Sequence, residues 1–240
     1  MAEQLIKGIR INWDKVDRHS YLREIEAINA LDSLKFNEAV TFFVGENGSG
    51  KSTLLEAIAV AYGFNAEGGT KNYNFSTYNS HSELCDAISV IKGCRMAGWG
   101  YFLRAESFYN VATKEEEYTK FSPVPYPSEE LHKKSHGESF LAVAQKHFRA
   151  NGVYILDEPE AALSPQRQLT LLFEIDRCAK MESQFIIATH SPILLGIPNA
   201  QILSFDDGKI HPCQYEETES YKVTEMFINN REQLLSHLLL

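Results

Sequence analysis

The chain lacks long hydrophobic runs. No apolar stretch in its 240 residues approaches the roughly 18 consecutive apolar residues that a helix needs to cross a bilayer. Residues 1–7 (MAEQLIK) contain neither the apolar core nor the cleavage-site pattern of a signal peptide. We therefore expect a cytoplasmic protein without a membrane segment.

Cysteine is sparse, and its spacing excludes the commonest cysteine sites. The four cysteines, at positions 85, 94, 178 and 213, include no C-x-x-C pair. We expect reduced structural thiols, as in proteins of reducing compartments, and no metal site built on cysteine.

Positive charge is in the minority. Lys and Arg number 23 against 32 Asp and Glu, which gives a formal net charge of −9. This balance disfavours general binding to nucleic acid, although it leaves room for a local basic patch. The hydrophobic content of 44% and the charged content of 23% are ordinary for a globular protein with a sizeable core.

The most informative feature that is present is the segment 45–52, with the sequence GENGSGKS. It matches the G-x-x-x-x-G-K-[ST] pattern of a phosphate-binding P-loop, between an apolar run and a helical pattern. Its glycines let backbone N–H groups surround phosphate oxygens, and the helix N-terminus adds partial positive charge. A glycine- and serine-rich turn is the alternative, which the flanking patterns disfavour.

Each P-loop residue has an expected part in nucleotide binding. Lys51 is predicted to contact the β- and γ-phosphates, where it also serves catalysis, and Ser52 is predicted to offer its hydroxyl to Mg²⁺. The predicted cofactors are therefore ATP and Mg²⁺. The nucleotide-binding residues that we predict here are Gly45, Glu46, Asn47, Gly48, Ser49, Gly50, Lys51, Ser52 and Thr53.

A second constellation lies at residues 153–158, where the apolar run VYIL ends in two adjacent carboxylates. This is typical of a Walker B strand. Asp157 is predicted to hold Mg²⁺ directly or through water, and Glu158 to act as the general base toward the attacking water. A solvated acidic turn is the alternative, which the P-loop elsewhere in the chain disfavours.

Apolar β runs alternate with helical patterns, which predicts an α/β fold with a largely parallel sheet. Asp206-Asp207-Gly208 indicates a hairpin turn. We expect strands at 3–13, 98–104, 153–156 and 185–189, helices at 20–31, 82–92, 139–150, 165–180 and 220–239, a loop at 65–80, and an extended surface segment at 113–130.

The ordered Lys-Ser, Asp-Glu-Pro and Ala-Thr-His elements resemble the ABC-type ATPases over nearly the whole chain. Residues 135–139 (SHGES) look like a divergent signature motif, 22 residues before the Walker B Asp157. Residues 161–164 (AALS) stand in the place of the D-loop, and His190 stands where the switch histidine does. Taken alone, SHGES would be a helix N-cap and His190 a structural histidine. The order and the spacing favour the family reading.

The resemblance implies a P-loop NTPase fold of the ABC-type ATPase head, with a mostly parallel core sheet, an antiparallel β portion and an inserted helical subdomain. One domain would span residues 1–240, with its core at about 1–65 and 139–240 and the insert at about 66–138. Two heads would form an ATP-dependent homodimer. Ser135 and the backbone of Gly137 would complete the γ-phosphate site of the partner, while His190 would hold the γ-phosphate and position the water.

Several positions depart from the family pattern. His136 and Glu138 replace usual signature residues, Ser164 replaces the usual D-loop aspartate, and no Q-loop glutamine is evident. Glu106, in the string RAES, is the candidate substitute near Mg²⁺, with an exposed charged loop as the alternative. Trp13 and Tyr21 are candidates for stacking on adenine, although core packing is the favoured interpretation of both.

The strings LDEPEAALSP and ATHSP look most like the soluble branch of the family, with its RecF-like, OLD-like and SMC-like heads, and RAESF with SHGESF resembles compact bacterial predicted ATPases. No heptads indicate coiled-coil arms between Ser52 and Ser135. The favoured function is ATP-driven DNA maintenance or phage defence, with DNA or a nuclease or toxin effector as partner. A membrane-transporter ATPase subunit and a slow nucleotide-gated scaffold are the alternatives.

Overall fold

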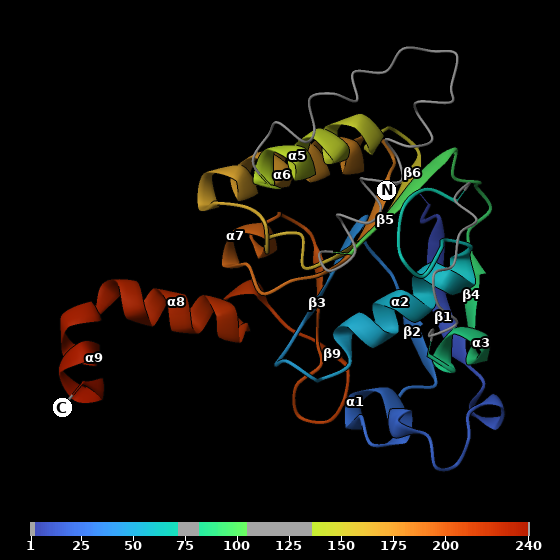
Figure 1. The fold of residues 1–240 in the computed structure, drawn as a ribbon, viewed down its shortest axis with the longest axis horizontal. Helices are drawn as coiled ribbons and strands as arrows, with labels where there is room; N and C mark the ends of the chain where they lie inside the picture. The colour runs from blue at the N-terminus through green and yellow to red at the C-terminus, as the bar shows by residue number, and fades with distance from the viewer. Residues whose placement is uncertain (1–2, 72–81, 105–135, 240) are drawn as a thin grey trace.

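The computed structural model describes residues 3–71, 82–104 and 136–239, with residues 136–140 described by their backbone alone. They form two sheets with helices on both sides of the larger one (Figure 1). The smaller sheet has the order β2-β1-β4 and is antiparallel, with the strands β1 (Ile6–Ile11), β2 (Ser33–Lys35) and β4 (Ile88–Lys92).

The larger sheet has the order β5-β6-β7-β3-β8-β9. Its first five strands are parallel, and only β9 runs antiparallel, to β8. This is the mixed α/β fold with the mostly parallel core sheet that the sequence pattern predicts and the separate antiparallel portion that the family resemblance implies. The strands are β3 (Val40–Val44), β5 (Trp99–Arg104), β6 (Gly152–Asp157), β7 (Gln184–Ala188), β8 (Gln201–Ser204) and β9 (His211–Pro212).

Every residue of β3, β6 and β7 is buried, because helices or the smaller sheet cover both faces. Alternate side chains enter two different cores, as the two-residue period of a strand requires. In β3, for example, Phe43 belongs to the core shared with α2 (Lys51–Tyr62) and the smaller sheet. Its neighbour Phe42 belongs to the core on the other face.

The second core lies beneath α5 (His136–His147), α6 (Pro165–Lys180) and α7 (Pro192–Leu195). These helices lie on the opposite side of the sheet from α2 in Figure 1. The bounds of α6 coincide with the predicted ones, because Pro165 occupies its first turn after the N-cap Ser164 and its buried residues follow the helical period.

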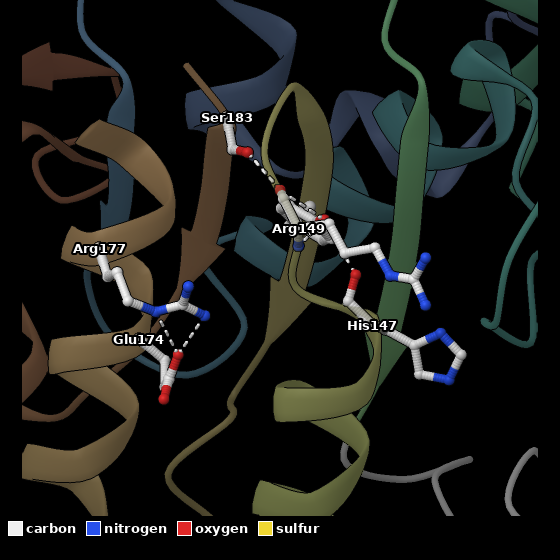
Figure 2. A network of polar contacts seen from close by, with 6 residues as sticks. His147, Arg149, Glu174, Arg177 and Ser183 are labelled. Atoms are coloured by element: carbon white, nitrogen blue, oxygen red, sulfur yellow. Dashed lines mark hydrogen bonds and ion pairs between the residues drawn. The ribbon is translucent and has the colours of Figure 1, made fainter. Parts of the chain in front are cut away.

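A polar network fixes the turn between α5 and β6 (Figure 2). The Ser183 hydroxyl donates to the carbonyl of Arg149 at 2.6 Å and accepts from the N–H of Gly152 at 3.1 Å. The Tyr154 hydroxyl donates to the carbonyl of His147 at 2.9 Å and accepts from the N–H of Arg149 at 2.6 Å. Backbone groups left free at the end of α5 are thereby satisfied, which anchors the strand that carries Asp157.

Two predicted helices are wrong in part. The helix expected at 82–92 is the single turn α3 (Leu84–Ala87) followed by β4, because the β-branched Ile88, Val90 and Ile91 pair with β1. The helix expected at 20–31 is reduced to a 3₁₀ turn, η2 (Tyr21–Arg23), and the short α1 (Glu26–Asn29), since Ile25 adopts an extended backbone between them.

The C-terminal helical pattern is also divided. The segment 220–239 forms α8 (Glu219–Asn229) and α9 (Arg231–Leu238), which break at Asn230 and extend away from the sheets (Figure 1). Neither helix has a buried residue among those described. The amphipathic pattern of residues 220–239 therefore predicted helical structure correctly, but the apolar side of this pattern is not buried against the rest of the protein.

Smaller differences affect other segments. The strand expected at 3–13 is shorter, and the helix expected at 139–150 begins and ends three residues earlier, at His136 and His147. The described part of the expected insert, 66–138, contributes α3, β4 and β5, while the segment 113–130 lies outside the described residues. The remaining short elements are η1 (Trp13–Lys15) and η4 (Tyr215–Glu217).

All four cysteines are free thiols, two of them buried. Burial raises the pKa of the Cys85 thiol to about 12, so this group stays protonated and unreactive at neutral pH. Across the ranges that the structure describes, no helix is both long and apolar enough to span a bilayer.

Candidate nucleotide-binding site

The predicted site residues meet at one edge of the larger sheet. β3 leads into Gly45, β6 ends at Asp157 and β7 is followed by His190. These strands are parallel neighbours, so their carboxyl ends lie side by side. In open α/β sheets this edge is where ligands bind. The topology therefore unites motifs that are more than a hundred residues apart in the chain.

The P-loop has the backbone geometry that its glycines predict. Gly45, Gly48 and Gly50 have φ angles of 139°, 83° and 97°, a region that favours glycine. At position 50 a Cβ would also lie 2.7 Å from the Cδ1 of Ile28. Gly50 is the N-cap of α2, so the loop passes directly into the positive end of that helix.

Lys51 lies at the centre of this edge and is 4% exposed. Its Nζ donates to the carbonyl oxygens of Gly45 and Glu46, both at 2.7 Å. Burial lowers the pKa of this ammonium, while the negative charges of Glu158, Asp206, Asp157 and Glu160 oppose the shift. The site therefore holds one buried cation among four carboxylates. A negatively charged ligand with a bound metal cation would match this mixture of charges, because its negative groups can pair with Lys51 and its cation with the carboxylates.

Ser52 and Asp157 meet as the metal prediction requires. The Ser52 hydroxyl, in the first turn of α2, donates to Asp157 Oδ1 at 2.9 Å. A hydroxyl and a carboxylate side by side are hard oxygen donors that fit Mg²⁺, which commonly takes one or two protein oxygens together with phosphates and water. Within the described ranges no cluster of three His, Cys, Asp or Glu forms a metal cage of its own. Glu106, the third predicted metal residue, lies outside the described residues.

Glu158 and His190 face each other across the ends of β6 and β7. Glu158 Oε1 lies 3.9 Å from His190 Nε2, and the two side chains are 44% and 39% exposed. Glu158 has a φ of 46°, a left-handed backbone that is rare for a non-glycine residue, and its N–H donates to the carbonyl of Ala188 at 2.9 Å. Strain held by the neighbouring strand in this way is characteristic of functional positions.

Sequence reasoning missed residues that hold the loops after β6 and β7. Glu160 Oε1 accepts the backbone N–H of His190 at 2.6 Å. Gln168 joins the two loops as well, because its Oε1 accepts from the Ser191 hydroxyl at 2.6 Å and its Nε2 donates to the carbonyl of Leu163 at 3.1 Å. The extra acid in DEPE was a visible signal for Glu160, whereas nothing in the sequence marked Gln168.

Some polar atoms at this edge are buried without a hydrogen-bond partner among the described residues: Ser49 Oγ, Glu160 Oε2 and His190 Nε2. Unpaired buried polar atoms are costly and uncommon in native proteins. A cavity of about 360 Å³ opens beside the P-loop, with Glu46, His190 and Lys222 in its lining. Both observations fit a polar ligand at this edge.

The remaining predicted residues fall into two groups. Ser135 lies outside the described residues, and the backbone of Gly137 lies in the first turn of α5. Trp13 packs against the core as expected, and its Nε1 donates to the carbonyl of Leu31 at 3.0 Å. The core packing expected for Tyr21 is wrong, since this side chain is 53% exposed and donates to the Ser82 hydroxyl.

The chain belongs to the AAA domain family, whose model matches residues 21–149, more than half of its length. Members of this family are generally P-loop ATPases, which supports ATP binding and hydrolysis by this chain. A second model, described as an AAA domain, putative AbiEii toxin, Type IV TA system, matches residues 138–196. No curated protein matches the chain significantly.

Solved structures with a similar fold include the SMC head domain from Thermotoga maritima, at 16% identity and a TM-score of 0.46, covering 89% of this chain and 100% of that one. An SmcHead bound to the C-winged helix domain of ScpA has 18% identity and a TM-score of 0.44, covering 77% and 94%. A putative metal-chelate type ABC transporter has 18% identity and a TM-score of 0.42, covering 82% and 80%.

Proposed function

We propose that the protein binds ATP with Mg²⁺ at the carboxyl edge of the larger sheet and hydrolyses its γ-phosphate. The observation that carries this proposal is the convergence of Lys51, the Ser52–Asp157 pair and the Glu158–His190 pair at the carboxyl ends of three adjacent parallel strands, β6, β7 and β3. Membership of the AAA domain family supports the same activity.

In this proposal the P-loop N–H groups and Lys51 bind the phosphates and offset the charge that develops on them. Glu158 takes a proton from the attacking water, and His190 holds the γ-phosphate and orients that water. Ser52 and Asp157 would hold Mg²⁺, which when bound neutralises phosphate charge. Glu160 keeps the backbone of His190 in place, which fixes the histidine relative to Glu158.

We further propose that ATP drives homodimerisation and that hydrolysis releases the dimer. Ser135 and the backbone of Gly137 of one copy would complete the γ-phosphate site of the other. The position of Gly137 in the first turn of α5 is compatible with this role, because N–H groups at a helix N-terminus favour phosphate oxygens. ATP would then act as a conformational switch.

The favoured biological output is DNA maintenance or phage defence, through DNA or a nuclease or toxin effector. The description of the second family model, which names a putative toxin of a type IV toxin–antitoxin system, supports the defence branch. The net charge of −9 favours a protein effector over extensive contact with DNA.

Sedimentation velocity of Glu158→Gln, with and without Mg-ATP, tests this proposal. Removing the base should lower turnover by about 10²- to 10⁴-fold while ATP binding persists, so a dimer should accumulate. Labelled duplex DNA in a second optical channel separates the outputs: DNA that sediments with the dimer supports DNA maintenance, and a dimer without DNA points to a protein effector.

Lys51→Ala in the same background is the matched control, since it should weaken nucleotide binding by roughly 100-fold or more and therefore remain monomeric. Ser135→Arg should bind ATP as a monomer without dimerising. A Ser135→Arg variant that dimerises normally would withdraw the signature assignment, and unchanged turnover in Glu158→Gln would remove Glu158 as the base.

A further inference from the structure

The residue Asp206 lies beside the P-loop, although the sequence predicted it only as part of a hairpin turn and not as a nucleotide-binding residue. It follows β8, which is the parallel neighbour of β3 on the side away from β7. The pairing continues past the strand end, where the N–H of Phe205 donates to the carbonyl of Val44 at 2.8 Å. This contact brings the next residue, Asp206, against the start of the P-loop.

Both oxygens of the Asp206 carboxylate are held in place. Oδ1 accepts the backbone N–H of Glu46 at 3.0 Å, and Oδ2 accepts the hydroxyl of Ser204 at 3.0 Å. The same hydroxyl accepts the N–H of Asp206 at 3.2 Å, and Ser204 is itself buried. The carboxylate is therefore a pre-oriented acceptor for one P-loop amide.

That amide belongs to the peptide group between Gly45 and Glu46, and the other end of this group is also held. Its carbonyl, that of Gly45, accepts from Lys51 Nζ at 2.7 Å. In a planar trans peptide the N–H and the carbonyl point in opposite directions. A carboxylate on one side and a cation on the other therefore fix the orientation of the whole group.

The backbone at this point needs such a constraint. Gly45 has a φ of 139°, a conformation open to glycine, and glycine loses more conformational freedom on ordering than any other residue. The contact is also close, since a Cβ at position 45 would lie 2.9 Å from Asp206 Oδ1. Without the acceptor, the first peptide of the loop would be free to rotate, and Lys51 would lose a fixed carbonyl.

We propose that Asp206 is a positioning residue for the P-loop, which holds the peptide between Gly45 and Glu46 and thereby sets the affinity for the nucleotide. This inference rests on the proposed ATP binding. Apparent affinity falls in proportion to the population of the binding-competent loop. The loss of one hydrogen bond to a charged group should lower the population of the binding-competent loop by about tenfold. ATP binding should therefore weaken by about tenfold.

Titration calorimetry with Mg-ATP on the full chain tests the proposal. Asp206→Ala should weaken binding about tenfold, because the acceptor is lost. Asp206→Asn keeps an acceptor oxygen and removes the charge, so it should bind within about twofold of the wild type, or more tightly since less negative charge faces the triphosphate. Asp207→Asn, at the next residue, whose side chain is exposed, is the control for the loss of negative charge near the loop and should change affinity by less than about twofold.

Steady-state kinetics separate positioning from a general structural defect. Asp206→Ala should raise KM for ATP about tenfold with kcat within about threefold, since Glu158 and His190 are untouched. Asp206→Asn should restore KM, which a loosened fold would not do. If Asp206→Ala does not fold, Ser204→Ala replaces it, with an expected two- to threefold loss of affinity from release of Oδ2.

The results that overturn the proposal are distinct from those that overturn the ATPase assignment. A folded Asp206→Ala variant with wild-type affinity, an Asp206→Asn variant as weak as Asp206→Ala, or, in the substitute experiment, a Ser204→Ala variant with unchanged affinity would overturn the role of Asp206. A wild-type protein that binds no nucleotide would overturn the proposed function itself, and this inference with it.

Discussion

The two sheets of this protein differ in burial and in chemistry. In the six-stranded sheet, β3, β6 and β7 are buried at every residue, and their carboxyl ends carry the nucleotide-binding motifs. In the three-stranded sheet only the central strand β1 is buried over most of its length, while β2 has no buried residue and β4 is buried only at its first residue. None of the candidate site residues lies on this smaller sheet. Parallel topology concentrates chemistry at one edge, whereas the antiparallel sheet serves to cover α2.

The two ends of α2 also differ, in the groups that surround their lysine side chains. At its N-terminus, Lys51 lies among carboxylates. At its C-terminus, Lys71 Nζ lies 3.5 Å from the centroid of the Tyr62 ring and Lys92 Nζ, at the end of β4, lies 5.3 Å from it. The positive charge of Lys71 and Lys92 is thus partly engaged by an aromatic ring at the helix end whose dipole favours cations.

The largest expected effect on ligand binding tests whether the chemistry resides at the edge of the larger sheet. Lys51→Ala should weaken ATP binding by roughly 100-fold or more, because it removes a buried charge-assisted contact to phosphate, worth about 3 kcal/mol. Calorimetry with Mg-ATP measures the loss. Nanomolar ATP affinity in this variant would contradict the assignment of the P-loop.

The difference in burial predicts a difference in stability. Phe185, in β7, is fully buried and stacks on Tyr154 with ring centroids 4.9 Å apart. Phe185→Ala should lower the free energy of unfolding by about 3–5 kcal/mol. The matched variant in the smaller sheet is Ile91→Ala, at a side chain that is 45% exposed, with an expected change of less than about 0.5 kcal/mol.

Urea titration of both variants at constant pH measures these changes. Equal losses in the two variants would show that the smaller sheet contributes to the cooperative core as much as the larger one does, which would remove the distinction drawn between them.

A pH-dependent effect on stability is expected at the C-terminal end of α2. Burial, together with the charge of Lys92, lowers the pKa of Lys71 to about 8, from 10.5 for a free lysine. Between these two values the unfolded chain binds more protons at this site than the folded one, so stability rises with pH through this window. The stability of the wild type relative to Lys71→Met should therefore increase between pH 8 and 10.5.

Chemical unfolding at several pH values measures the free energies of unfolding of the two proteins. Because all other titrating groups are present in both, their contributions cancel to first order when one free energy is subtracted from the other. A difference that is constant over the window, or that falls with pH, would show that Lys71 is solvated in the folded protein.

Much of the parallel sheet could be predicted from local pattern. The runs at 98–104, 153–156 and 185–189 are strands, and the helix at 165–180 has the predicted bounds, because continuous apolar runs and helical periodicity are local signals. The helix predicted at 82–92 failed because β4 is specified by its pairing with β1, more than 70 residues away. Such pairing energy does not appear in a single window of sequence.

The candidate site divides in the same way. Sequence patterns predicted roles for Lys51, Ser52, Asp157 and Glu158, since the chemistry of phosphate and Mg²⁺ restricts which residue types can serve at these points. The role predicted for His190 came from the family resemblance. Both missed Glu160 and Asp206 as holders of the loops. Their role is to accept backbone N–H groups, and any suitably placed oxygen can do that, so no residue pattern is required.

The sequence by itself determined the class of this protein, because the P-loop and Walker B patterns are short, local and chemically demanding. Only the tertiary structure decided how these motifs are held: which strands are neighbours, that Ser52 meets Asp157 at 2.9 Å, and that Asp206 reaches the amide of Glu46 from the segment after β8. Contacts between residues distant in the chain depend on the register and order of strands, which are set by packing across the whole sheet.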